Sequence, residues 1–151
     1  MAQEISQVVR FRVQRQQLAI DVMAVDEVMQ PREVSTVPGQ PSFVAGVIHL
    51  RGEYIPLVDM RDRFGVPREG NESDKIVVVR GAEFRLALAV DGVGEVEKID
   101  PDELSAPPVD SGLGGPQSLI AVFTRDEEMV MLLDVETLLS ADERARLPSL
   151  P

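Results

Sequence analysis

Residues 43–61 read FVAGVIHLRGEYIPLVDMR, and this stretch carries the clearest structural signal in the chain. Val44–Leu50 and Tyr54–Val58 are apolar, β-branched runs of strand length, and the Arg-Gly-Glu triplet between them has the composition of a turn. Asp59 follows the second run, where its carboxylate can accept backbone N–H bonds at the start of a helix over Met60–Phe64. The stretch therefore predicts a β-hairpin that leads into a short, aspartate-capped helix.

Three further pairs of apolar runs have the length and punctuation of β-hairpins. In each pair, two runs of strand length flank a short polar or glycine-containing segment. The pairs are Val8–Val13 with Leu18–Val22, Lys75–Arg80 with Phe84–Val90, and Leu119–Phe123 with Met129–Leu133. The sequence therefore predicts a protein built mainly from short strand pairs.

Helical patterns are brief. Val22, Val25 and Val28 recur at helical spacing ahead of Pro31, which cannot continue a helix, so we predict one short helical turn there. Ala141–Leu147 predicts a second short helix, which the following proline ends.

An internal repeat organises these elements. Leu18–Val28 aligns without gaps on Leu86–Val96, with six of eleven positions identical. A strand ending in aspartate follows later in each half, at Asp59 and at Asp134. A short match in an apolar-rich sequence also arises by chance, but two similar β lobes are the simplest account.

The expected architecture is mainly β, with two small five-stranded lobes and short helices. Closed or nearly closed barrels of the SH3-like or OB-like kind suit many short strands, because closure removes exposed sheet edges. We place lobe one at about residues 14–74 and lobe two at about residues 75–140, with the N-terminal strand free to cross between the lobes.

Composition excludes much chemistry. The 151 residues contain no cysteine and one histidine, so disulfides, thiol nucleophiles and multi-histidine metal sites are ruled out. The net charge of −11 would repel nucleic acid. The N-terminus has no leader pattern, and no run approaches about 18 apolar residues, so we expect a soluble, cytosolic protein without direct membrane insertion. We expect no catalytic residues, metal or cofactor.

Two residues invite a chemical role. His49 alternates with Val47 and Arg51 on one face of its predicted strand, where a structural or surface role is far commoner than catalysis. The turn projects Arg51, whose five-donor guanidinium suits a partner's carboxylates or carbonyls. From spacing alone, an arginine held only in solvent is an equally good interpretation.

The 43–61 stretch resembles the signature of the CheW family of bacterial chemotaxis coupling proteins. Similarity extends through Ile20–Val22, Val25–Val28, Leu88–Val93 and Leu132–Asp134. The resemblance implies a single CheW-like domain over residues 1–151 that acts as a non-catalytic adaptor. It would couple the signalling tip of a chemoreceptor, a methyl-accepting chemotaxis protein, to the regulatory domain of the histidine kinase CheA. The adaptor would be cytoplasmic and recruited to membrane-associated receptor arrays.

The resemblance also implies site residues. Receptor contact maps onto a groove between the lobes, with glycines in the motif turn; the matching residues are Val25, Glu27, Val28 and Arg51, with Gly46 and Gly52. The valines suit apolar affinity, and the two charged residues suit specificity. Two departures stand out: His49 replaces the family's usual Asn, and Ser118–Phe123 replaces a glycine-containing stretch.

Three alternatives remain. The adaptor could serve a non-flagellar chemosensory pathway, such as surface motility or another output. A kinase-associated regulatory domain uses the same fold, but this length leaves no room for kinase or receiver motifs. A small enzyme or nucleic-acid binder is opposed by the missing catalytic constellation and by the acidic charge.

Overall fold

The computed structural model describes residues 5–36, 38–64, 75–107 and 119–147. Its strands are β1 Gln7–Val13, β2 Gln16–Asp21, β3 Val25–Met29, β4 Gly46–Leu50, β5 Glu53–Asp59, β6 Lys75–Arg80, β7 Arg85–Val90, β8 Gly92–Lys98, β9 Leu119–Arg125 and β10 Glu128–Leu133. Its helices are α1 Met60–Phe64 and α2 Ala141–Ala145, and 3₁₀ turns span Val22–Ala24, Pro101–Glu103 and Val135–Thr137.

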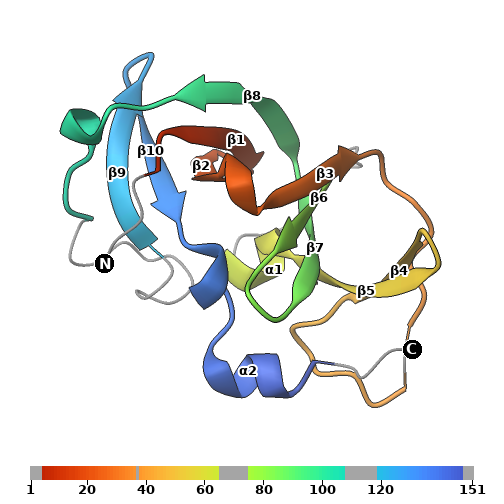
Figure 1. Ribbon diagram of the computed structural model, residues 1–151. Helices are drawn as coiled ribbons and strands as arrows, with labels where there is room; N and C mark the ends of the chain where they lie inside the picture. Colours follow the sequence, from red (N-terminus) through yellow and green to blue (C-terminus); the bar gives the residue numbers. More distant parts are fainter. Residues whose placement is uncertain (1–4, 37, 65–74, 108–118, 148–151) are drawn as a thin grey trace.

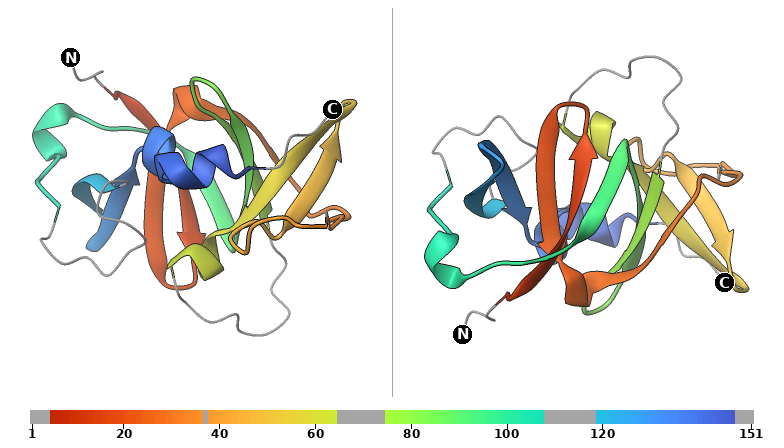
Figure 2. Two further views of the ribbon diagram at one scale, coloured as in Figure 1. Left: turned by 90° about the horizontal axis from the view of Figure 1, so that it is seen from below. Right: turned by 90° about the horizontal axis from the view of Figure 1, so that it is seen from above.

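Within the described residues the strands form two five-stranded sheets (Figure 1). The first sheet has the order β8-β1-β2-β10-β9, and the second has the order β3-β6-β7-β5-β4. All four predicted hairpins are confirmed, as β1–β2, β4–β5, β6–β7 and β9–β10. Figure 2 shows β4–β5 and β9–β10 at opposite ends of the molecule, with β1–β2 between them.

The two sheets repeat one topology, as the internal repeat predicted. In each sheet the central strand pairs antiparallel on one side and parallel on the other: β2 with β1 and β10, and β7 with β6 and β5. The register matches as well. Ala19 pairs with Leu132 in the first sheet, and the repeat-equivalent Ala87 pairs with Leu57 in the second.

The limits predicted for the lobes, 14–74 and 75–140, do not follow the sheets. Each repeat segment crosses from one sheet to the other, because β2 lies in the first sheet and β3 in the second, while β7 lies in the second and β8 in the first. The second sheet therefore takes all its strands from residues 25–90, and the first combines residues 7–21 with 92–133. Apolar alternation indicates that a strand is half-buried but does not indicate which sheet buries it.

The short helical turn predicted from the spacing of Val22, Val25 and Val28 is confirmed only in its first three residues. Only Val22–Ala24 is a 3₁₀ turn, and the rest is β3, antiparallel to β6. The register shifts at Asp26, whose carboxylate accepts hydrogen bonds from Arg80 at 2.7 Å and Arg85 at 3.0 Å. The extra residue of this bulge gives the valines a spacing of three, which imitates a helix.

The sheets are SH3-like lobes rather than closed barrels. In the part of the chain that the structure describes, the two outer strands of each sheet form no ladder with each other. A single bridge takes the place of closure in each lobe, between Ser35 and Val47 and between Ser105 and Val122. The segment after β3 thus contacts β4 at one antiparallel bridge, and the segment after β8 contacts β9 at another.

One apolar core lies between the sheets and holds them together. Burial of each large apolar side chain is worth roughly 1.5–3 kcal/mol. Its main members are Phe11, Leu18 and Ile20 of the first sheet, Val77, Leu86 and Leu88 of the second, and Leu138 and Leu139 ahead of α2. The predicted C-terminal helix is confirmed as α2, which Ser140 and Glu143 start with a capping box. Among the described residues, the helices are too short to span a membrane.

Candidate functional site

Arg51 and Glu27 meet from opposite edges of the second sheet. Arg51 and Gly52 form the two-residue turn of hairpin β4–β5, with φ of +51° and +82°, as a tight hairpin requires. Glu27 lies on β3, the outer strand at the far side of the same sheet. The Arg51 Nη2 atom is 2.7 Å from the Glu27 Oε1 atom, so the ion pair joins the two edges.

The two partners differ in exposure. The Arg51 side chain is 73% exposed and the Glu27 side chain only 23%. Glu27 Oε1 accepts no well-aligned hydrogen bond despite its short distance from the guanidinium, so this contact is an ion pair without hydrogen-bond alignment. The exposed guanidinium therefore keeps N–H donors accessible to a partner.

A groove separates the lobes beside β3. It has a volume of about 530 Å³ and is lined by Val28, Met29 and Gln30 from β3 and its end, by Lys75 at the start of β6, and by Val93 and Gly94 of β8. Its two sides are the outer strands β3 and β8, each of which lies in the other sheet from the strand that precedes it in the sequence (Figure 1). Val28 is 43% exposed beside this groove.

The predicted set of contact residues is therefore divided. Successive side chains on a strand project to opposite faces, so Val28 faces the groove while its neighbour Glu27 faces Arg51. Val25 is partly buried and packs against the central core, and its contact with a partner stays a prediction. Sequence reasoning missed the β8 side of the groove. The internal repeat held the signal, because Val93 and Val96 align with Val25 and Val28.

The two motif glycines have different tasks. Gly52 occupies the predicted turn at positive φ. Gly46 is not a turn residue: it begins β4 and pairs with Leu57. A Cβ atom at Gly46 would collide with Val34 and lie 2.6 Å from the Ser35 carbonyl oxygen, so glycine is needed for the chain to close along β4.

His49 faces outward with Arg51, as predicted, whereas Val47 of the same predicted face is buried beneath the Ser35 bridge. The His49 ring stacks on Tyr54 across the hairpin, with ring centroids 4.7 Å apart. The His49 carbonyl accepts a hydrogen bond of 2.9 Å from Arg32. These contacts give His49 a structural role at the surface of the hairpin.

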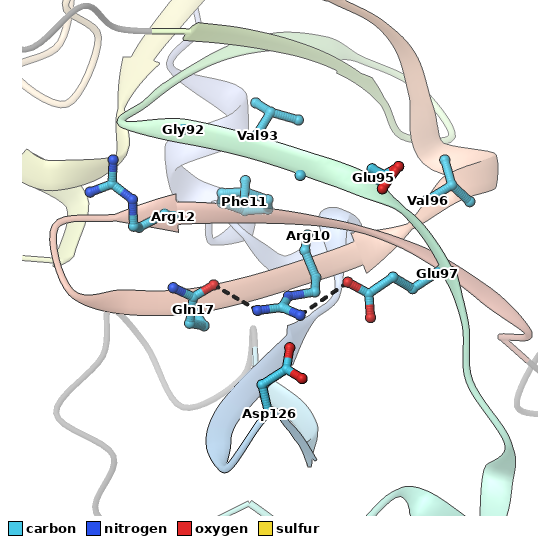
Figure 3. Close-up of a pocket in the computed structure, with 11 residues that line it drawn as sticks. Arg10, Phe11, Arg12, Gln17, Gly92, Val93, Glu95, Val96, Glu97 and Asp126 are labelled. Atoms are coloured by element: carbon cyan, nitrogen blue, oxygen red, sulfur yellow. Dashed lines mark hydrogen bonds and ion pairs between the residues drawn. The ribbon is translucent and has the colours of Figure 1, made fainter.

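The first sheet does not repeat the charged pair. A cavity of about 630 Å³ lies over β1 and β8. Figure 3 shows that Arg10 is held by its neighbours in the wall, because it donates to Glu97 at 3.0 Å and to Gln17 at 3.1 Å. Glu95, the repeat equivalent of Glu27, and Asp126 also line this cavity. Across the described ranges, no group of Asp, Glu and His side chains is arranged to hold a metal.

The fold defines the class as a two-lobed β protein whose lobes exchange their outer strands and leave a groove between them. The family model for the CheW-like domain matches residues 7–143, and the chain belongs to this family.

Known relatives agree. The chemotaxis protein CheW of Klebsiella aerogenes is 27% identical over 136 residues, covering 89% of this chain and 82% of the relative. That of Helicobacter pylori is 28% identical over 142 residues, covering 93% and 85%. The crystal structure of the scaffolding protein TtCheW from Thermoanaerobacter tengcongensis superposes with a TM-score of 0.84 at 25% identity, covering 98% of this chain and all of that one.

Proposed function

We propose that this chain is a non-catalytic adaptor that couples chemoreceptors to the histidine kinase CheA. The observation that carries the proposal is the apolar groove between β3 and β8, with Val28 on one wall and Val93 on the other. The groove receives the signalling tip of a receptor, and a second surface binds the regulatory domain of CheA.

The groove suits a partner segment that presents apolar side chains. Apolar residues stand on both of its walls, and such central apolar contacts supply most of the affinity of protein interfaces. Lys75 adds one cation to the lining, which suits a partner that brings carboxylates.

Arg51 acts beside the groove rather than inside it. Glu27 anchors the guanidinium through the 2.7 Å contact, and this contact also ties β3 to the β4–β5 turn. The accessible donors of Arg51 recognise a carboxylate or carbonyl of a partner. Glu27 therefore positions Arg51, and Arg51 supplies specificity.

The acidic charge of −11 agrees with an adaptor that works among protein partners in the cytoplasm, where receptor arrays recruit it. On this proposal the adaptor joins the array only through receptor and kinase contacts.

Reconstitution with CheA and a receptor signalling fragment tests the proposal. Val28→Asp should weaken receptor-fragment binding at least about tenfold, because it places a charge in an apolar contact. Ile120→Asp is the matched control, since Ile120 is 42% exposed on β9, a strand that does not line the groove. If Val28→Asp retained wild-type receptor binding and kinase control, the groove assignment would be wrong.

A further inference from the structure

Three charged side chains are buried where the two lobes meet. Asp59, Arg61 and Asp91 are 2%, 3% and 7% exposed. Arg61 donates to both oxygens of Asp59, from Nε at 3.1 Å and Nη2 at 3.2 Å. Its remaining nitrogen, Nη1, donates to Asp91 Oδ1 at 3.1 Å.

This network joins one sheet to the other. Asp59 ends β5 and Arg61 lies in α1, so both belong to the second lobe. Asp91 stands between β7 and β8, and its Oδ2 atom accepts a hydrogen bond of 2.6 Å from the backbone N–H of Gln14, in the β1–β2 turn. The Asp91 backbone N–H donates to the Arg12 carbonyl at 2.8 Å. Arg61 therefore holds the second lobe against two points of the first.

The network adds directional hydrogen bonds to the apolar contacts between the two sheets. Apolar contact is non-directional, so a core alone leaves small rotations between its two halves cheap. Charge-assisted hydrogen bonds from a planar guanidinium fix distance and angle together. Asp91 also lies two residues before Val93, so its position sets that of the β8 wall of the groove.

Among the described residues, the other junction between the lobes has a different link, in which the Glu136 carboxylate accepts a hydrogen bond of 2.6 Å from the backbone N–H of Ala82, between β6 and β7. By the internal repeat, Met23 corresponds to Asp91 and Glu136 to Arg61. Met23 is 76% exposed, and Glu136 carries the wrong charge to bridge carboxylates. Within the part of the chain that the structure describes, a clamp of this kind, a guanidinium that bridges two carboxylates between the lobes, is therefore found at the Asp91 junction alone.

We propose that Arg61 is a positioning residue: by tying Asp59 to Asp91, it sets the angle between the lobes and hence the width of the groove between β3 and β8. The consequence for receptor affinity rests on the proposed function, whereas the effect on groove width does not.

The width can be measured directly, because the chain has no cysteine and accepts a single pair of spin labels. Gln30→Cys and Glu95→Cys place labels at exposed positions, one beyond β3 and one on β8. Asp91→Asn keeps the shape of the side chain but removes its charge, and Arg61→Met removes the bridge. Both variants should broaden the distribution of distances between the labels.

Two controls separate the clamp from general stability. Ile55→Ala removes a buried side chain from the second lobe's own core and should lower the melting temperature without broadening the distribution. Asp62→Asn removes an exposed carboxylate next to Arg61 and should change neither quantity. If Arg61→Met fails to fold, Asp91→Asn carries the test. A wild-type distribution in folded Asp91→Asn would overturn the proposal.

Receptor affinity then tests the link to function. If the wider distribution of label distances means that only about a tenth of the molecules have a groove of the width that binds the receptor fragment, the apparent Kd for that fragment rises about tenfold. A broadened distribution with unchanged receptor affinity would support the clamp and refute the assignment of the groove to the receptor.

Discussion

Arg51 and Asp126 occupy equivalent positions in the two-residue turns of hairpins β4–β5 and β9–β10, yet they carry opposite charges. Both have φ of +51°, and each is followed by a second residue at positive φ, Gly52 in one turn and Glu127 in the other. The repeated fold thus presents two similar hairpin tips with different chemistry. Only the tip with Arg51 pairs with a carboxylate on β3.

Exchanging glycine between these turns should alter stability in opposite directions. Glu127→Gly should raise the free energy of unfolding by up to about 1 kcal/mol, because it removes a side chain from the left-handed region. Gly52→Ala should lower it by about 1 kcal/mol. Urea denaturation measures both, and an unchanged midpoint in Gly52→Ala would show that the turn tolerates a side chain.

The Arg51–Glu27 pair should matter more to binding than to folding. An ion pair this exposed contributes about 0–1 kcal/mol, so Arg51→Met and Glu27→Gln should each leave the melting temperature nearly unchanged. Partner binding should fall in both. The double variant Arg51→Glu with Glu27→Arg keeps an ion pair but moves the guanidinium from the β4–β5 turn to β3. If this double variant bound partners normally, the role of Arg51 would be limited to its ion pair with Glu27, and direct contact of Arg51 with a partner would be excluded.

Salt should distinguish the charged contact from the apolar one. Exposed charges are screened over about 8 Å at physiological ionic strength, so wild-type receptor binding should weaken as salt rises. Arg51→Met should flatten that dependence, whereas Val28→Ala should weaken binding without changing its slope. Binding isotherms from 50 to 500 mM salt, roughly the range over which screening strengthens, make this comparison. Equal slopes for wild type and Arg51→Met would exclude a charged contact.

Gly46→Ala should loosen the edge of the second sheet. The added methyl group would collide with Val34 and the Ser35 carbonyl, at a cost of about 1–3 kcal/mol. Amide hydrogen exchange should accelerate at Val47, whose N–H donates to the Ser35 carbonyl at 2.8 Å. Gly94→Ala is the control for stability, because its nearest contact, the Arg10 carbonyl oxygen, would be 3.6 Å away. Similar losses in both variants would contradict the steric argument.

Glu103 should titrate at lower pH than an ordinary glutamate. The backbone N–H of Asp100 and then the Arg125 guanidinium lower its pKa by hydrogen bonding to the carboxylate. Because the folded pKa is depressed, its stabilising effect is present above the unfolded pKa and disappears as pH falls through the folded pKa. An NMR titration of the side-chain carboxyl checks the shift. Glu103→Gln should remove that part of the pH dependence.

Sequence patterns predicted local structure well and long-range pairing poorly. The hairpins were predictable, and so was the Asp59 cap, whose Oδ1 atom accepts the backbone N–H of Arg61 at 2.9 Å, because alternation, turn residues and caps act over a few residues. The topological repeat was predictable from the internal sequence repeat. The bulge at Asp26 made β3 resemble a helix, and the crossing of β3 and β8 between sheets left no local signal. The contact residues that the family motif suggested, Val25, Glu27, Val28 and Arg51, stay predictions. Val93 and the Arg61 clamp depend on contacts between distant segments and were missed.

The exchange of outer strands also sets an order of assembly during synthesis. Every strand of the second sheet is encoded between residues 25 and 90, so that sheet can be completed as soon as this part of the chain has left the ribosome. The first sheet can be completed only after residue 133 has been synthesised, although its β1–β2 hairpin is synthesised first. Until then the apolar face of that hairpin, including Phe11 and Leu18, has only the second sheet to cover it. The earliest strands of the protein thus rely on the later-made lobe for protection from aggregation before they gain their own sheet.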